Sequence, residues 1–233
     1  MALGSVVAAV TALALLILIR FLYIVLRSGK SLHGKSQKPY STLVILGSGG
    51  HTAEMLNLLS VLQKDRFAPR FYVAAATDTM SLQKARMMED SLVDAVKHLC
   101  LYFNDTAGVK VGETAKYMQI YRSREVGQSY VTSVWTTLLA TAHALYIMIQ
   151  LRPEVILCNG PGTCIPLCII AFVFKVLGIR WSSIFYVESI ARVRRLSLSG
   201  LLLYKLRVAD QFFVQWPQLH RKYPRAEYVG CLM

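Results

Sequence analysis

One stretch near the start of the chain constrains the fold more than any other. The apolar run Leu43–Leu46 passes directly into the small residues of Gly47–Thr52, which is typical of a buried strand that ends in a tight turn. Residues 53–62 then carry apolar side chains at helical spacing, with Thr52 as the expected N-cap. This strand, turn and helix predict the opening unit of a doubly wound, mainly parallel α/β sheet.

The glycine turn predicts a site for a negatively charged group. Its glycines let backbone N–H groups approach a ligand closely, and a helix N-terminus favours negative charge, so we expect a phosphate. Two nucleotide fingerprints are incomplete, because Thr52 stands where the NAD-type motif has glycine and a Gly-Lys-Ser/Thr sequence is absent. His51 could face the bound group as a titratable side chain. A tight turn with a solvated histidine is the plainer alternative.

Composition narrows the class of partner. Hydrophobic residues make up 55% of the chain and its mean hydropathy is +0.43, so a membrane segment is expected. The net charge of +13 attracts phosphates, and the apolar excess favours membrane or lipid phosphate over nucleic acid. Five cysteines lie mostly in apolar runs, and no histidine accompanies Cys164 and Cys168. We therefore expect reduced, buried thiols in a cytosolic environment, with no metal and no cofactor.

The N-terminus predicts a membrane anchor. Residues 1–19 carry no charge, and after Arg20 the apolar run continues to residue 26, which is about the length that crosses a bilayer. A cleaved signal peptide would have positive charges before the run, but here they follow it, so the remainder should be cytosolic. We predict a single transmembrane anchor at residues 1–27, a basic linker at 28–41 and a Rossmann-like domain at 42–233.

Strand and helix patterns alternate along this domain. A second glycine turn, Asn159–Thr163, follows one expected strand, and Glu188 follows the next. Parallel sheets bind ligands outside the carboxyl ends of their strands, so both should meet His51 there, with Arg192 nearby. We expect strands at 71–76, 117–121, 154–158, 182–187, 211–214 and 227–229, and helices at 81–97, 132–151, 164–177 and 199–208.

Acidic residues in the first half have plainer expected roles. Asp78 imitates a ribose-binding acid at a strand end, but it lies further from the glycine turn than the ~20 residues of a dinucleotide site. Capping of the helix at 81–97 is the better interpretation. Glu89, Asp90 and Asp94 should form a solvated face of that helix, whereas the helix at 164–177 should be buried in the core.

Five motifs in this order resemble a known family. They are Gly47–Thr52, Arg122–Val126, Leu157–Thr163, Tyr186–Ile190 and Val214–Pro217. The chain resembles the membrane-anchoring subunit of the eukaryotic UDP-GlcNAc transferase that adds the second sugar of the dolichol-linked N-glycan precursor. The resemblance implies half of a GT-B glycosyltransferase, the acceptor-binding half. It also implies a small cytosolic catalytic partner that carries the UDP-GlcNAc-binding half, on the cytosolic face of the endoplasmic reticulum membrane.

The resemblance implies roles for residues as well. In the bacterial GT-B enzyme that forms lipid II, the matching motifs line the acceptor cleft, although only the glutamate of its His-Glu-Gln-Asn element carries over. His51 would lie near the pyrophosphate or the sugar 4-hydroxyl, and Glu188 would be a hydrogen-bond acceptor or base. The implied residues that bind the acceptor, GlcNAc-PP-dolichol, are Gly47, Ser48, Gly49, Gly50, Thr52, Asn159, Gly160, Gly162 and Arg192.

The last residues predict a partner surface. Cys231, Leu232 and Met233 form an uncharged tail directly after the last expected strand, in a chain of net charge +13. We expect this tail and the sheet edge beside it to dock the catalytic chain, a frayed terminus being the alternative. Two other functions remain open: a membrane scaffold without site residues, and a membrane-bound Rossmann oxidoreductase. The second is disfavoured by the incomplete fingerprint and by the lack of a Tyr-x-x-x-Lys pair.

Overall fold

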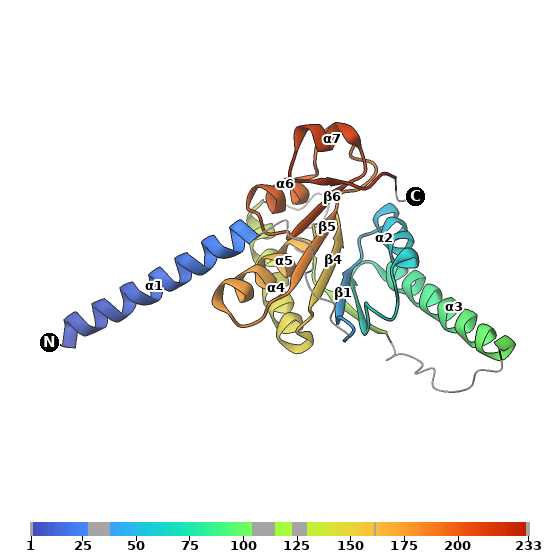
Figure 1. Ribbon diagram of the computed structural model, residues 1–233, viewed down its shortest axis with the longest axis horizontal. Helices are drawn as coiled ribbons and strands as arrows, with labels where there is room; N and C mark the ends of the chain where they lie inside the picture. Colours follow the sequence, from blue (N-terminus) through green and yellow to red (C-terminus); the bar gives the residue numbers. More distant parts are fainter. Residues whose placement is uncertain (1, 28–37, 104–114, 123–129, 161, 232–233) are drawn as a thin grey trace.

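A single parallel sheet forms the centre of the computed structural model, which describes residues 2–27, 38–103, 115–122, 130–160 and 162–231 (Figure 1). Its strands are β1 (Thr42–Ile45), β2 (Arg70–Ala75), β3 (Lys116–Ile120), β4 (Val155–Asn159), β5 (Ser183–Val187), β6 (Gln211–Val214) and β7 (Glu227–Tyr228). The order across the sheet is β3-β2-β1-β4-β5-β6-β7, and every neighbouring pair is parallel. The predicted doubly wound sheet is confirmed.

The apolar runs become the central strands because those strands are covered on both faces. Leu43, Val44 and Ile45 of β1 are each fully buried, and β2, β4 and β5 are buried over almost their whole length. The edge strands β3 and β7 are partly or fully exposed. Burial is therefore deepest where β1 and β4 lie side by side.

Helices cover both faces of the sheet (Figure 1). One face packs against α2 (Gly50–Val61) and α3 (Thr79–Phe103). The other packs against α4 (Tyr130–Leu151), α5 (Cys164–Leu177), α6 (Leu198–Lys205) and α7 (Pro217–Lys222). Most of α5 is buried, as predicted for a core helix. Helix α3 extends beyond the expected 81–97 at both ends.

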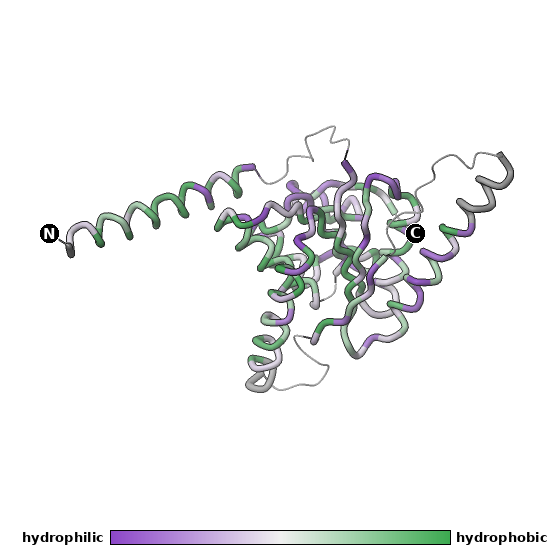
Figure 2. Tube along the Cα trace, turned by 90° about the horizontal axis from the view of Figure 1, so that it is seen from below, coloured by the Kyte–Doolittle hydropathy of each residue, from purple (hydrophilic) through white to green (hydrophobic). Residues whose placement is uncertain are grey.

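Among the described residues, two helices are long and apolar enough to cross a membrane by length and composition. The first, α1 (Ala2–Arg27), projects away from the domain and is apolar along most of its length (Figures 1 and 2). Its last turns pack on α5, where the ring of Phe21 meets that of Phe172 edge-on at 6.0 Å. The second is α4, in which Lys, Arg, Asp and Glu are absent.

Two expectations about side chains are wrong. Glu89 is buried rather than solvated, because Arg70 and Tyr72 of β2 donate hydrogen bonds to its Oε1 at 3.2 and 2.5 Å. Cys231 is exposed, whereas the thiols were expected to be buried. Several other expectations concern segments outside the described residues: most of the basic linker, positions 123–126 of the second motif, Leu232 and Met233.

Candidate functional site

The two glycine turns lie side by side at the point where the sheet reverses its winding. The register pairs Ile45 of β1 with Cys158 of β4, so the two strands end at nearly the same level. From here the chain winds outward to β3 on one side and to β7 on the other. Such a switch point leaves a crevice at the carboxyl edge, where doubly wound sheets bind ligands.

The first turn is braced from inside by hydroxyl groups. Thr52 is not the N-cap, because α2 begins at Gly50 and Gly49 takes that position with φ 63°. The Thr52 hydroxyl is buried, donates to the Gly47 carbonyl oxygen and lies 2.6 Å from Ser81 Oγ. The side chains therefore hold the carbonyl side of the turn. The first N–H groups of α2, which have no intrahelical partner, are left for a ligand.

A cavity of about 840 Å³ opens beside this turn, within the range of small-molecule sites. Its polar and small lining residues include Gly47, Ser48, Gly49, His51, Thr52, Asp78, Ser81, Lys84, Arg122, Thr137, Gly160, Gly162, Thr163 and Ser199. Asp78 caps α3, as predicted, by accepting hydrogen bonds from the N–H and Oγ of Ser81 at 3.1 and 2.6 Å. Its charge is thus partly satisfied, while Lys84 and Arg122 add two positive charges. The cavity favours an anionic guest.

Sequence reasoning missed Lys84 and Arg122 as site residues. Arg122 lies two residues beyond the end of β3, so its place at the carboxyl edge of the sheet was the available signal. Lys84 lies in the second turn of α3, after the Asp78 cap. No feature of the sequence around it indicates that its side chain would line the cavity.

His51 stands between the two turns. Its Nδ1 lies 3.2 Å from Asn159 Oδ1, and its ring lies against Gly160, where an added Cβ would come within 2.7 Å of Cε1. Asn159 was expected to bind the acceptor, but its side chain is buried behind His51 and does not line the cavity. The second turn therefore fixes the position of the histidine.

Behind Asn159 lies Glu54, a buried carboxylate that the sequence analysis did not single out. Its Oε2 accepts a hydrogen bond from Asn159 Nδ2 at 2.7 Å, and its Oε1 accepts one from Ser189 Oγ at 2.8 Å. Glu54 follows His51 by three residues, so the two share one face of α2. This spacing from His51, together with the position of an acid inside an apolar run, could have indicated from the sequence that Glu54 belongs to the site.

Glu188 and Arg192 take other places than expected. Glu188 is fully buried and does not line the cavity, although its partner Ser197 directly precedes residues 198–199, which do. Its Oε2 accepts hydrogen bonds from the N–H and Oγ of Ser197 at 3.0 and 3.1 Å. Burial raises the pKa of the Glu188 carboxyl, and its hydrogen bonds from Ser197 and Ser189 offset part of that effect. Arg192 is exposed and does not line the cavity.

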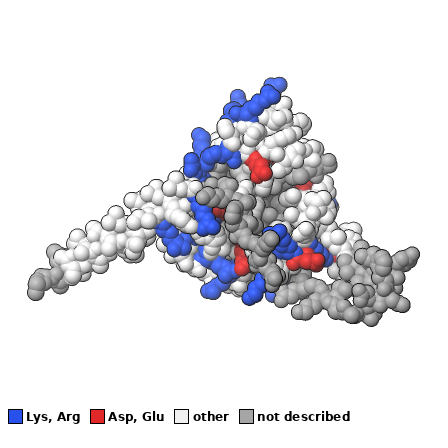
Figure 3. Space-filling view, viewed as in Figure 1, with Lys and Arg blue, Asp and Glu red and all other residues white. Residues whose placement is uncertain are grey.

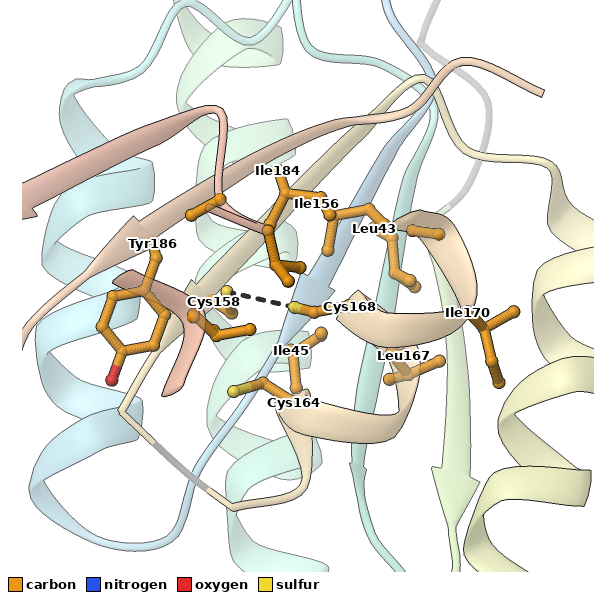
Figure 4. Close-up of a cluster of buried hydrophobic side chains, with 14 of the residues drawn as sticks. Leu43, Ile45, Ile156, Cys158, Cys164, Leu167, Cys168, Ile170, Ile184 and Tyr186 are labelled. Atoms are coloured by element: carbon orange, nitrogen blue, oxygen red, sulfur yellow. Dashed lines mark hydrogen bonds between the residues drawn. The ribbon is translucent and has the colours of Figure 1, made fainter. Parts of the chain in front are cut away.

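Among the described residues, three cysteine thiols lie close enough together to hold a metal ion. The sulfur atoms of Cys158, Cys164 and Cys168 lie within 4.8 Å of one another in the apolar core (Figure 4). Cys158 Sγ also lies 3.7 Å from Cys168 Sγ and donates to the Phe185 carbonyl oxygen at 3.4 Å. Burial raises the pKa of Cys158 well above its usual value, whereas hydrogen bonds from Cys158 and Cys164 lower the pKa of Cys168 to about 5. All three side chains are buried in the apolar core, and none of them lines the cavity.

Comparison with known proteins gives a consistent set of relatives. A family described as "Oligosaccharide biosynthesis protein Alg14 like" matches residues 42–232. A Yarrowia lipolytica protein is 39% identical over 98% of this chain and 99% of its own length. A human protein is 40% identical over 97% of this chain and 96% of its own. Both are named UDP-N-acetylglucosamine transferase subunit ALG14. Acinetobacter baumannii MurG covers 77% of this chain and 43% of its own, with TM-score 0.49 and 18% identity.

Proposed function

The chain belongs to the Alg14-like family of oligosaccharide biosynthesis proteins. From this premise we propose that it is the subunit of an N-acetylglucosaminyltransferase that binds the acceptor, GlcNAc-PP-dolichol. A separate small cytosolic subunit supplies the UDP-GlcNAc-binding half. The observation that carries this proposal is the cavity at the switch point. Its glycine turn, Lys84 and Arg122 suit a pyrophosphate, and His51 supplies a titratable group beside it.

His51 meets the acceptor hydroxyl in this proposal. A neutral imidazole nitrogen can take a proton from a hydroxyl that attacks a sugar carbon, which contributes ~10²–10⁴-fold to a rate. Glu188 remains the second proposed residue. Because it accepts hydrogen bonds from Ser197, the N-cap of α6, the described geometry supports action through the first turn of that helix, whose residues 198–199 line the cavity.

Membrane attachment is proposed through α1, with the domain on the cytosolic side of the endoplasmic reticulum. Lys and Arg side chains gather over α6, α7 and the foot of α1 (Figure 3), which suits an anionic membrane surface. The uncharged helix α4 also supports membrane attachment. Its apolar side chains Trp135 and Leu138 are exposed, and Thr137, between them in the sequence, lines the cavity. An apolar surface beside a phosphate site suits a lipid pyrophosphate.

The proposed partner contact lies at the β7 edge of the sheet. Tyr228 and Val229 are half-exposed there and Cys231 follows them in an exposed position. Removal of Cys231, Leu232 and Met233 should abolish recruitment of the catalytic subunit, while the truncated chain still folds and stays in the membrane. Full recruitment by the truncated chain would move the interface elsewhere.

The site is tested in the reconstituted two-subunit enzyme. His51→Ala and Glu188→Gln should each lower kcat, with membrane attachment and partner binding unchanged. Lys84→Ala should raise the KM for the acceptor ~10-fold, since a charge-assisted hydrogen bond contributes ~1.5–3 kcal/mol. Arg86→Ala is the matched control, because Arg86 is on the same helix but lies over the Tyr117 ring and outside the cavity lining. Normal turnover in the first two variants would favour a scaffold without site residues.

Topology has its own test. A glycosylation acceptor site added after Met233 should stay unmodified in microsomes, because the domain is proposed to be cytosolic. Modification of that site would place the domain in the lumen and contradict the proposed orientation.

A further inference from the structure

The proposed function gives no task to Glu54, although its carboxylate is among the most deeply placed acids in the domain. Its side chain is 4% exposed, and among the described residues its hydrogen bonds come from Asn159 and Ser189, both of which are neutral. Within the described part of the chain, Glu54 forms no ion pair. Burying a carboxylate without a cationic partner is costly, so its position calls for an explanation.

The carboxylate decides how the amide of Asn159 is turned. Both carboxylate oxygens of Glu54 accept hydrogen bonds, and the group of Asn159 that donates to Oε2 at 2.7 Å is the Nδ2 amide. The other end of the amide, Oδ1, then faces His51 Nδ1 at 3.2 Å. Because Oδ1 can only accept, the proton of a neutral His51 is held on Nδ1.

This arrangement leaves Nε2 as the unprotonated ring nitrogen. His51 lines the cavity, and its Nε2 makes no hydrogen bond within the described residues. Gly160 lies against one side of the ring, where an added Cβ would come within 3.5 Å of Cε1, Nδ1 and Nε2, so the second turn limits the movement of the ring. A lone pair on Nε2 can accept a proton from a hydroxyl, whereas it would repel a pyrophosphate oxygen.

We propose that Glu54 is a positioning residue that, through Asn159, holds His51 in the tautomer whose Nε2 can accept a proton from the acceptor hydroxyl. This inference rests on the proposed function of His51. In the step, the hydroxyl oxygen forms a bond to the sugar carbon of UDP-GlcNAc and the bond from that carbon to the diphosphate breaks. The diphosphate leaves with the bonding electron pair, and the hydroxyl proton goes to Nε2.

The tautomer can be measured on the full chain in detergent or nanodiscs. With ¹⁵N-labelled histidine and the His51→Ala variant for assignment, His51 should show a protonated Nδ1 and an unprotonated Nε2 when neutral. The opposite tautomer in the unsubstituted protein would overturn the inference, whatever the variants do. In Glu54→Met the amide of Asn159 is free to turn round and donate to Nδ1, so the proton should move to Nε2.

Kinetics of the reconstituted enzyme separate positioning from support of the fold. Glu54→Met should lower kcat ~100-fold with little change in the acceptor KM, and Glu54→Gln, which keeps an acceptor oxygen, should recover most of that loss. In a His51→Ala background, Glu54→Met should have no further effect. An equal loss in both backgrounds would mean that Glu54 only supports the fold.

Two further outcomes keep the proposals apart. Full activity of Glu54→Met beside an inactive His51→Ala would reject the role of Glu54 alone, whereas full activity of His51→Ala would reject the proposed function of the histidine. Glu89→Met is the matched control, because Glu89 is also buried but pairs with Arg70 and Lys64 away from the cavity. It should lower the thermal unfolding midpoint and leave the tautomer of His51 unchanged.

Discussion

The two glycine turns at the carboxyl edge look alike in sequence but are built for different tasks. Gly49 of the first turn has φ 63°, and an added Cβ there would meet open space. Gly160 of the second turn has the same φ, but its added Cβ would strike the ring of His51. The first turn thus exposes its backbone toward the cavity, whereas the second is closed against a side chain from the first.

The polar side chains of the two turns, Thr52 and Asn159, also serve different tasks. Thr52 reaches inward to brace the Gly47 carbonyl, and the backbone N–H groups of the turn stay available. Asn159 reaches sideways to His51 and to Glu54. One turn presents groups to a ligand and the other positions one of those groups. Substitutions that separate conformation from contact can test this division.

Gly160→Ala should have the largest effect. The alanine is strained at positive φ and its Cβ would come 2.7 Å from His51 Cε1, so the ring must move. We expect kcat to fall at least ~100-fold and the unfolding free energy to fall by about 1–3 kcal/mol. Gly162→Ala is the matched control in the same turn, because a Cβ there meets nothing within 4 Å. Equal losses in both variants would contradict the contact between the turns.

Gly49→Ala should have a smaller effect, since it adds strain without a clash. A residue held at φ 63° and ψ −120° is confined to a region that favours glycine, which costs about 2 kcal/mol of unfolding free energy. We expect a weaker acceptor affinity, seen as a rise in KM, with kcat changed less than in Gly160→Ala. Gly50→Ala, at ordinary φ with open space around its Cβ, should leave the unfolding free energy almost unchanged. A loss in Gly50→Ala as large as in Gly49→Ala would show that backbone strain is not the cause.

These differences explain how far the sequence could lead. Apolar runs that end in glycine predict buried parallel strands, and the sheet then places both turns at one edge without further information. The direction of each side chain at that edge is decided by packing. Asn159 reaches behind His51 because a buried carboxylate faces its amide, and Glu188 stays outside the cavity lining, where Ser197 donates two hydrogen bonds to it.

Acidic residues were the hardest to place from sequence. Glu89 was expected in solvent because its own helix shows a mixed face, but its partners Arg70 and Tyr72 stand on β2, 19 and 17 residues earlier. Glu54 pairs with residues more than 100 positions away. Pairings of this kind depend on how helices pack on the sheet, so no local pattern contains them.

Thr52→Val should have a smaller effect again, on stability more than on turnover. The change keeps the shape of the side chain but removes the hydroxyl that braces the Gly47 carbonyl, which Ser81 still contacts at 3.0 Å. We expect the unfolding free energy to fall by about 1–3 kcal/mol, measured by denaturant unfolding of the full chain. Thr52→Ser keeps the hydroxyl and should stay close to the unsubstituted protein. An unchanged unfolding free energy in Thr52→Val would mean that the hydroxyl does not brace the turn.

Glu188→Gln should have the smallest effect on stability, a change in how the unfolding free energy depends on pH. Burial raises the folded pKa of Glu188 above the unfolded value of ~4.3, so the folded chain keeps this proton where the unfolded chain has lost it. Its contribution to stability is full below the unfolded pKa and is lost as pH rises through the folded pKa. The glutamine cannot ionise, so relative to the unsubstituted chain its thermal midpoint should rise across this window.

Glu89→Gln supplies the comparison of opposite sign. Burial alone would raise the pKa of Glu89, but hydrogen bonds from Tyr72 and Lys64 and the charge of Arg70 lower it. The ionised form therefore stabilises the fold above the unfolded pKa, and that contribution is lost as pH falls through the folded pKa. The glutamine variant should lose most stability near neutral pH and approach the unsubstituted chain in acid. If the unfolding free energies of the two variants changed with pH in the same direction, Glu188 would have an ionic partner like that of Glu89. The end of β5 would then not be held by neutral donors alone.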